Sequence, residues 1–354
     1  MRTPAGSISA DRDRAGPGAA GKEREIDMLL SRSPVRISLG GGGTDLKSYY
    51  SQFGGFLIAG AINKYVFIVA NPHFSDSIRL SYSQTEIVDS VAKIKHPIFR
   101  EALQMLKIEK AIELVSVADV PSNSGLGSSS AFTVALLNSL HHFHRDYITL
   151  KDLAEEACRL EIDRMGKPIG KQDQYASAFG GINAYWFEKD GSVRVEPVRL
   201  PREQVNDLER NILLFYIGKS RSADDILAVQ DKATSLGDRQ MVEKLHHIKE
   251  IGLRTKAAFE KGDIDAFGEL LHEHWMTKKR LSKGVSDPAI DELYEIGKAN
   301  GALGGKIIGA GGGGFLMLYC PGEKAKLIEV MAKNNVHPLW FRFEFEGARV
   351  IFAG

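Results

Sequence analysis

Apolar positions recur with period two in parts of this chain and with helical spacing in others. The pattern predicts strands at 29–39, 78–82, 112–120, 182–187, 193–200, 211–217, 339–345 and 348–352, two short β runs within 56–70, and strands flanking the glycines at 309–314. Helices are predicted at 97–106, 131–144, 150–164, 170–179 and 323–334, and further helices fill most of the chain from 218 to 300. Strands and helices mix without strict βαβ alternation, which predicts the α+β class.

The length of 354 residues favours two domains over a single core. Residues 1–27 are rich in Gly, Ala, Arg and Asp and contain few large apolar residues, so we expect a disordered N-terminal extension. The composition shifts after Pro201. We therefore predict an N-terminal domain over 28–205 and a C-terminal domain over 206–354.

Composition and charge exclude several classes of partner. The formal net charge is +1, so no global field attracts nucleic acid or an anionic membrane. The apolar runs are too short to span a bilayer, and the two cysteines, Cys158 and Cys320, have no metal or redox spacing. The histidines show no zinc pattern. A reduced, cytoplasmic setting fits. The sequence leaves the oligomeric state open, with a homodimer as one candidate.

The segment 121–131, PSNSGLGSSSA, carries the strongest chemical signal. It joins a predicted strand to a predicted helix, and its glycines let backbone N–H groups converge at the helix N-terminus, where an anion is stabilised. It fits neither a Walker A loop nor a dinucleotide fingerprint. A helix capped by serine after a glycine turn is the structural alternative. We predict a phosphate-binding loop whose nucleotide-contacting residues are Pro121, Ser124, Gly125, Leu126, Gly127, Ser128, Ser129 and Ser130.

Two further glycine segments flank this loop along the chain. Arg36 lies in a predicted strand that ends in the glycines 40–43, and 306–314 is a strand, a glycine loop and a strand. The ordered trio resembles the GHMP kinase superfamily from about residue 29 to the C-terminus, and Arg36 with the segment 41–46 resembles its sugar 1-kinase branch. The resemblance implies a two-domain α+β fold, with ATP, Mg²⁺ and a sugar bound in the cleft between the domains.

The resemblance also implies roles for individual residues. Asp173 matches the aspartate near the acceptor hydroxyl, as general base or as the group that orients the hydroxyl, and Arg36 matches the active-site arginine. Ser129 and Glu161 match the ligands of Mg²⁺. The structural alternatives are an Arg–Asp pair that only joins a strand to a helix, and a solvated glutamate on a helix.

The acceptor-binding residues are predicted at two glycine segments and in two basic segments. Asp45 suits the hydroxyls of a sugar, although an Asx turn or a helix cap would also use it. Glycines 42 and 43 stand where galactokinases have Glu and His, which leaves space for a seven-carbon sugar. The predicted substrate-binding residues are Gly43, Thr44, Asp45, Lys171, Arg221, Gly311 and Gly312, of which Lys171 and Arg221, with Lys219, are candidates for a distal phosphate.

The resemblance thus implies transfer of the ATP γ-phosphoryl group to the anomeric C1 hydroxyl of a heptose 7-phosphate. The basic run 278–280 is interpreted as a solvated helix face. One alternative is a fucokinase- or galactokinase-like enzyme for an unphosphorylated sugar. Another, from a different class, is a catalytically silent sensor that binds sugar and ATP.

Overall fold

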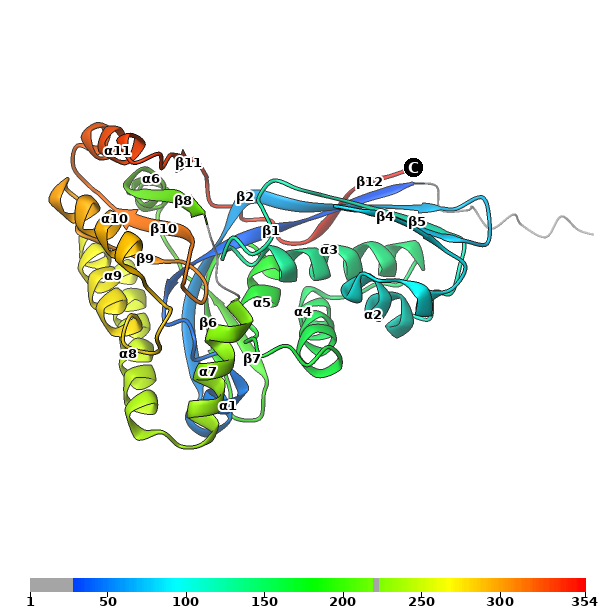
Figure 1. The fold of residues 1–354 in the computed structure, drawn as a ribbon, viewed down its shortest axis with the longest axis horizontal. Coiled ribbons are helices and arrows are strands. Elements are labelled where there is room, and N and C mark those ends of the chain that lie inside the picture. Colours follow the sequence, from blue (N-terminus) through cyan, green and yellow to red (C-terminus); the bar gives the residue numbers. More distant parts are fainter. Residues whose placement is uncertain (1–27, 219–222) are drawn as a thin grey trace, which may run out of the picture.

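The computed structural model describes residues 28–218 and 223–354, which form two β-sheets with helices packed against them (Figure 1). The mixed architecture confirms the α+β prediction. The predicted N-terminal extension, 1–27, and the candidate phosphate ligands Lys219 and Arg221 lie outside the described residues. Among the helices that are described, none combines the length and apolarity that crossing a membrane requires.

The larger sheet has eight strands in the order β12-β1-β2-β5-β3-β4, and β6 and β7 extend it from β2. Its pairs are antiparallel except β3 with β5. Because β12 pairs with β1, the end of the chain returns to the sheet in which the described chain begins. The strands are β1 (Leu29–Gly40), β2 (Gly55–Pro72), β3 (Ile78–Ser81), β4 (Thr85–Val88), β5 (Ile112–Ala118), β6 (Ile182–Phe187), β7 (Val193–Pro197) and β12 (Arg349–Ala353).

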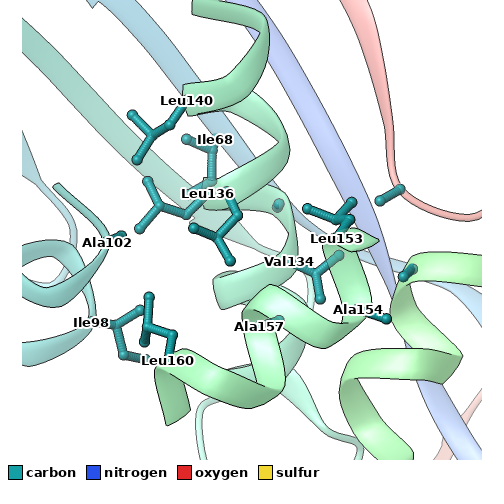
Figure 2. Close-up of a cluster of buried hydrophobic side chains, with 14 of the residues drawn as sticks. Ile68, Ile98, Ala102, Val134, Leu136, Leu140, Leu153, Ala154, Ala157 and Leu160 are labelled. Carbon is teal, nitrogen blue, oxygen red and sulfur yellow. The ribbon is translucent and has the colours of Figure 1, made fainter. Parts of the chain in front are cut away.

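Helices cover one face of this sheet, and the longest of them, α3, is buried along most of its length. Leu136 and Leu140 of α3 meet Ile68 of β2, Ile98 of α2 and Leu153 of α4 in a fully apolar cluster (Figure 2). Burial of each leucine or isoleucine stabilises the folded state by about 1.5–3 kcal/mol. This packing therefore holds α3 in place, and with it the loop at its N-terminus. The helical segments are α1 (Lys47–Phe53), a 3₁₀ turn (Val91–Lys93), α2 (Pro97–Met105), α3 (Ser128–Phe143), α4 (Leu150–Cys158), a π-helical segment (Arg159–Arg164) and α5 (Gln172–Phe179).

The smaller sheet is antiparallel, in the order β11-β8-β10-β9, and lies at the opposite end of the molecule from α2 (Figure 1). Helix α9 packs against α8 on one side and β9 on the other, which places the end of α9 beside the glycine loop between β9 and β10. The elements are α6 (Arg202–Asn211), β8 (Ile212–Gly218), α7 (Ala223–Ser235), α8 (Arg239–Lys261), α9 (Asp265–Lys278), α10 (Pro288–Ala299), β9 (Gly304–Ile307), β10 (Gly314–Tyr319), α11 (Lys324–Lys333) and β11 (Pro338–Leu339).

Two predicted elements differ from the structure. The strand predicted at 339–345 is wrong beyond Leu339. These residues make only one isolated β-bridge, between Phe343 and Ile62, because the N–H of Arg342 donates to Asn63 Oδ1 and that of Phe343 to Glu209 Oε1. The two β runs predicted within 56–70 form one continuous strand, β2, whose register against β1 shifts near Pro34. The division of the chain at residue 205 stays a prediction.

Candidate active site

The three glycine segments meet at one cavity between the two sheets. The loop after β1 contributes Gly43 and Asp45, and the serine–glycine loop contributes Gly125. The C-terminal half contributes the end of α9 and Gly309 of the third glycine segment. Segments far apart in the sequence therefore build one site, as the sequence predicts.

The serine–glycine loop leads into α3 through two glycines in the left-handed region. Gly125 has φ +82°, and a Cβ there would lie 2.6 Å from the carbonyl oxygen of Ile308, so the loop touches the third glycine segment directly. Gly127, with φ +76°, immediately precedes the helix. The exposed amides at the start of α3 and the positive end of its dipole make this an anion site.

The structure places the predicted loop residues in two groups. Five of them line the cavity: Gly125, Gly127, Ser128, Ser129 and Ser130. The other three do not: Pro121 is exposed, Ser124 is buried beneath the loop, and Leu126 is buried in the core. The carbonyl oxygen of Leu126 accepts a hydrogen bond from the Arg36 amide, which ties the loop to β1.

Arg36 and Asp173 form an ion pair at the cavity wall. Asp173 Oδ1 accepts from Arg36 Nε at 2.7 Å and lies 2.6 Å from Nη2, while Arg36 Nη1 donates to the carbonyl oxygen of Gly125 at 2.6 Å. The arginine side chain is buried and that of Asp173 is partly exposed. Oδ2 of Asp173 has no hydrogen-bond partner among the described residues and faces Gly127. This free oxygen is available to a substrate hydroxyl.

A buried carboxylate, Glu161, lies beside the start of α3. It accepts from Ser130 Oγ at 2.7 Å, from Ser129 Oγ at 3.2 Å and from Gln174 Nε2 at 2.7 Å. The ammonium group of Lys167 lies 2.9 Å from Glu161 Oε1 and 3.0 Å from Ser129 Oγ. The structural alternative, a solvated glutamate on a helix, is thus excluded, because Glu161 is fully buried.

The oxygens around Lys167 fit a divalent cation. A hydroxyl and a carboxylate are the hard ligands that Mg²⁺ prefers, and the position between them already attracts a positive charge. Across the described parts of the chain, no group of three or more His, Cys, Asp and Glu side chains is arranged to hold a metal ion. Phosphate and water oxygens would therefore complete a Mg²⁺ shell that begins with Ser129 and Glu161.

Asp45 is buried and lines the same cavity. Its Oδ1 accepts from the Gly43 amide and its Oδ2 from the Gln172 amide, both at 3.1 Å. Burial raises the pKa of Asp45, and the negative charge of Asp173 raises it further. The two carboxylates therefore share one polar pocket. Thr44 does not line the cavity, because its hydroxyl donates to the carbonyl oxygens of Gly41 and Phe56.

The remaining predicted acceptor residues lie elsewhere. Lys171 forms an ion pair with Glu155 at 3.1 Å and lines a second cavity, which also reaches Asp45. Gly311 and Gly312 pack against Val285, whose carbonyl oxygen accepts from the Gly312 amide, and do not line the main cavity.

Several lining residues were not predicted. Gln230 of α7 donates to the carbonyl oxygen of Gly43 at 2.9 Å and fills part of the space predicted beside that glycine. Lys278 lines the cavity and is not the solvated residue that the basic run indicated, whereas Arg280 is exposed. Lys306 lines it as well. Single lysines carry no sequence signal of this kind, because any helix face or strand can present one.

Sequence comparison matches two parts of the chain to known families. Residues 87–181 match the GHMP kinases N terminal domain, and residues 255–337 match the GHMP kinases C terminal domain. The first range contains the serine–glycine loop, Glu161 and Asp173. The second contains α9 and the third glycine segment.

Individual relatives extend over most of the chain. A D-glycero-alpha-D-manno-heptose 7-phosphate kinase of Campylobacter jejuni is 29% identical, over 92% of this chain and 99% of its own. An L-fucokinase/L-fucose-1-P guanylyltransferase of Bacteroides fragilis is 26% identical over 88% of this chain, which spans 37% of that longer protein. A solved structure of a D-glycero-D-manno-heptose 1-phosphate kinase from Bacteroides thetaiotaomicron superposes with a TM-score of 0.76 at 25% identity, covering 92% of this chain and 99% of that one.

Proposed function

Because this chain belongs to the GHMP kinases, we propose that it is an ATP- and Mg²⁺-dependent sugar kinase that phosphorylates the C1 hydroxyl of D-glycero-D-manno-heptose 7-phosphate. The product would be the 1,7-bisphosphate, an intermediate of nucleotide-heptose biosynthesis. The observation that carries the proposal is the Arg36–Asp173 pair, which joins the phosphate loop to a carboxylate oxygen that is free to meet a hydroxyl.

Phosphoryl transfer requires an anion cradle, a cation and an oriented acceptor. In the proposed reaction the start of α3 holds the phosphates of ATP, and Mg²⁺ held by Ser129 and Glu161 would neutralise their charge. The acceptor oxygen bonds to the γ-phosphorus while the bond from phosphorus to the β,γ-bridging oxygen breaks, and that electron pair leaves with ADP. Asp173 Oδ2 accepts the hydroxyl proton and later releases it to water.

The position of Asp45 supports a sugar as the acceptor. Its buried oxygens each accept one backbone N–H, and their remaining lone pairs suit sugar hydroxyls. Asp45 also borders the second cavity, where Lys171 lies. A sugar whose C1 lies at Asp173 and whose hydroxyls meet Asp45 would extend toward Lys171, which we propose as a ligand of the distal phosphate.

The names of the relatives leave the acceptor position open. One relative is named for a heptose 7-phosphate and the other for a heptose 1-phosphate. Phosphorylation of the first at C1, or of the second at C7, would yield a 1,7-bisphosphate. The fucokinase relative keeps an unphosphorylated sugar as the second candidate. The cytoplasmic setting and the oligomeric state stay predictions.

The test is an ATP-dependent kinase assay with heptose 7-phosphate, heptose 1-phosphate, fucose and galactose as acceptors. We expect turnover with heptose 7-phosphate and formation of the bisphosphate. Turnover of fucose or galactose alone would replace the proposed acceptor with an unphosphorylated sugar. Binding of ATP and sugar without turnover of any acceptor would favour a sensor over an enzyme.

A further inference from the structure

Four cationic side chains line the main cavity, and only two of them have an acidic partner within the described chain. Arg36 pairs with Asp173 and Lys167 with Glu161. Lys278 and Lys306 are left without one among the described residues.

Within the described residues, these two lysines contact only neutral hydrogen-bond partners. Lys306 is 2% exposed, and its ammonium lies 3.3 Å from Nδ1 of His274, which is also buried. Lys278 donates to the carbonyl oxygen of Ile307 at 3.1 Å and to that of Gly309. A positive charge withdrawn from water is costly unless an anion joins it. The pair of lysines is therefore a site that favours an anionic ligand.

Lys278 lies beside the phosphate loop. Its two carbonyl partners flank Ile308, whose own carbonyl oxygen packs against Gly125 of the phosphate loop. Arg36 binds the carbonyl oxygen of the same Gly125. Lys278 thus lies where the two glycine loops touch, next to the arginine that connects the phosphate loop to Asp173.

The electrostatic neighbours agree with this location. Burial lowers the pKa of Lys278 and of Lys306; the charge of Arg36 lowers the pKa of Lys278 further, and the charges of Lys278 and Arg36 lower that of Lys306 further. Both lysines therefore lie within electrostatic reach of Arg36, the residue that contacts the phosphate loop.

We propose that Lys278, assisted by Lys306, is a catalytic residue that contacts the phosphoryl group during its transfer and neutralises the charge on its oxygens. The proposal rests on the kinase function proposed above. Bond making and breaking are those given there: the acceptor oxygen replaces the bridging oxygen of ADP at phosphorus, and the lysines exchange no proton with either. A fixed cation from the C-terminal half would stabilise the charge that develops on the transferred group.

The other anion that Lys278 could contact is a phosphate already present on the acceptor. Steady-state kinetics distinguishes this role from contact with the transferred phosphoryl group. The experiment compares the wild type, Lys278→Met, Lys278→Arg and the control Lys279→Met. Lys279 is the next residue along the chain, but it pairs with Asp291 and does not line the cavity. Each protein is assayed for kcat and KM with the acceptor that the wild type uses, and calorimetry gives the Kd for ADP and for a non-hydrolysable ATP analogue.

We expect Lys278→Met to lower kcat by about 100-fold, as removal of a charge-stabilising donor does, with the acceptor KM within about threefold of wild type. Lys278→Arg should recover about tenfold of the loss because its charge remains. Lys279→Met should behave as the wild type. If the lysine contacts the γ-phosphate before transfer, the wild type should bind the ATP analogue more tightly than ADP, and Lys278→Met should lose this difference in Kd.

Two results would overturn the proposal. One is a Lys278→Met enzyme with wild-type kcat and an unchanged preference for the analogue over ADP. The other is an unchanged kcat with a raised KM for the sugar phosphate, which would assign the lysine to the acceptor's own phosphate. If the wild type phosphorylates no sugar, the proposed function fails, and the ratio of the two nucleotide affinities alone decides the role of Lys278. Melting temperatures within a few degrees of wild type establish that each variant is folded.

Discussion

Replacement of Asp173 by Asn tests the centre of the proposed site with little change of shape. The amide oxygen of Asn can still accept from Arg36 Nε, which lies 2.7 Å from the present Oδ1. The change removes the negative charge and the oxygen that would accept the hydroxyl proton. Loss of general-base assistance lowers kcat by about 10²–10⁴-fold, which corresponds to about 2.7–5.4 kcal/mol in the activation free energy.

The effect of Asp173→Asn on stability should be much smaller. Loss of a charge-assisted hydrogen bond to Arg36 costs about 1.5–3 kcal/mol in the free energy of unfolding. Asp173 is partly exposed, which reduces this cost, and the variant also removes the repulsion that raises the pKa of Asp45. We therefore expect the melting temperature to fall by less than about 5 °C and nucleotide affinity to survive.

The assay couples ADP release to NADH oxidation, with calorimetry for nucleotide binding and a thermal melt for folding. The matched control is Asp207→Asn, because Asp207 forms another Asp–Arg pair, with Arg210, on the exposed face of α6. The control should retain wild-type kcat. A folded Asp173→Asn enzyme with kcat within tenfold of wild type would refute the assignment of Asp173 as the general base.

Three further variants test other parts of the site. Glu161→Gln should raise the Mg²⁺ concentration for half-maximal activity by about tenfold or more, measured by Mg²⁺ titration of the rate, because a buried ligand charge is lost; an unchanged titration would contradict the metal assignment. Gly125→Ala should lower the free energy of unfolding, measured in urea, by more than the control Gly191→Ala does. Both glycines have positive φ, but only at Gly125 would the new Cβ meet a backbone oxygen, that of Ile308, 2.6 Å away. Equal losses would show that the serine–glycine loop and the third glycine segment do not need this contact. Burial and the facing charge of Arg36 lower the pKa of Lys278 to about 7, with Lys306 of β9 and His274 of α9 nearby, so the protonated form and kcat/KM should decline as pH rises through that value. In Lys278→Arg this decline should disappear, since a guanidinium stays charged, and an identical alkaline decline in the variant would exclude Lys278 as its source.

Local sequence patterns determined the fold class, most element positions and the phosphate loop. The run 121–131 predicts a glycine turn and a helix N-terminus whatever surrounds it, because left-handed glycines and the unpaired amides of a first helical turn are properties of the local backbone. The α+β class and most element positions follow from periodicity in the same way. The pairing of Arg36 with Asp173 needed the resemblance as well, since 137 positions separate the two residues.

Only the tertiary structure decided which side chains complete the cavity. Lys278 belongs to a basic run that looks solvated in the sequence, and it lines the site because α9 ends against the third glycine segment. Lys167 and Gln230 are ordinary polar residues until folding brings them to Glu161 and Gly43. The segment 340–345 likewise resembles a strand, but it makes only one isolated β-bridge, between Phe343 and Ile62, and two of its amides donate to side chains. Hydrophobic periodicity indicates which face of a helix or strand is buried. Which residues that face contacts depends on how elements distant in the sequence pack together.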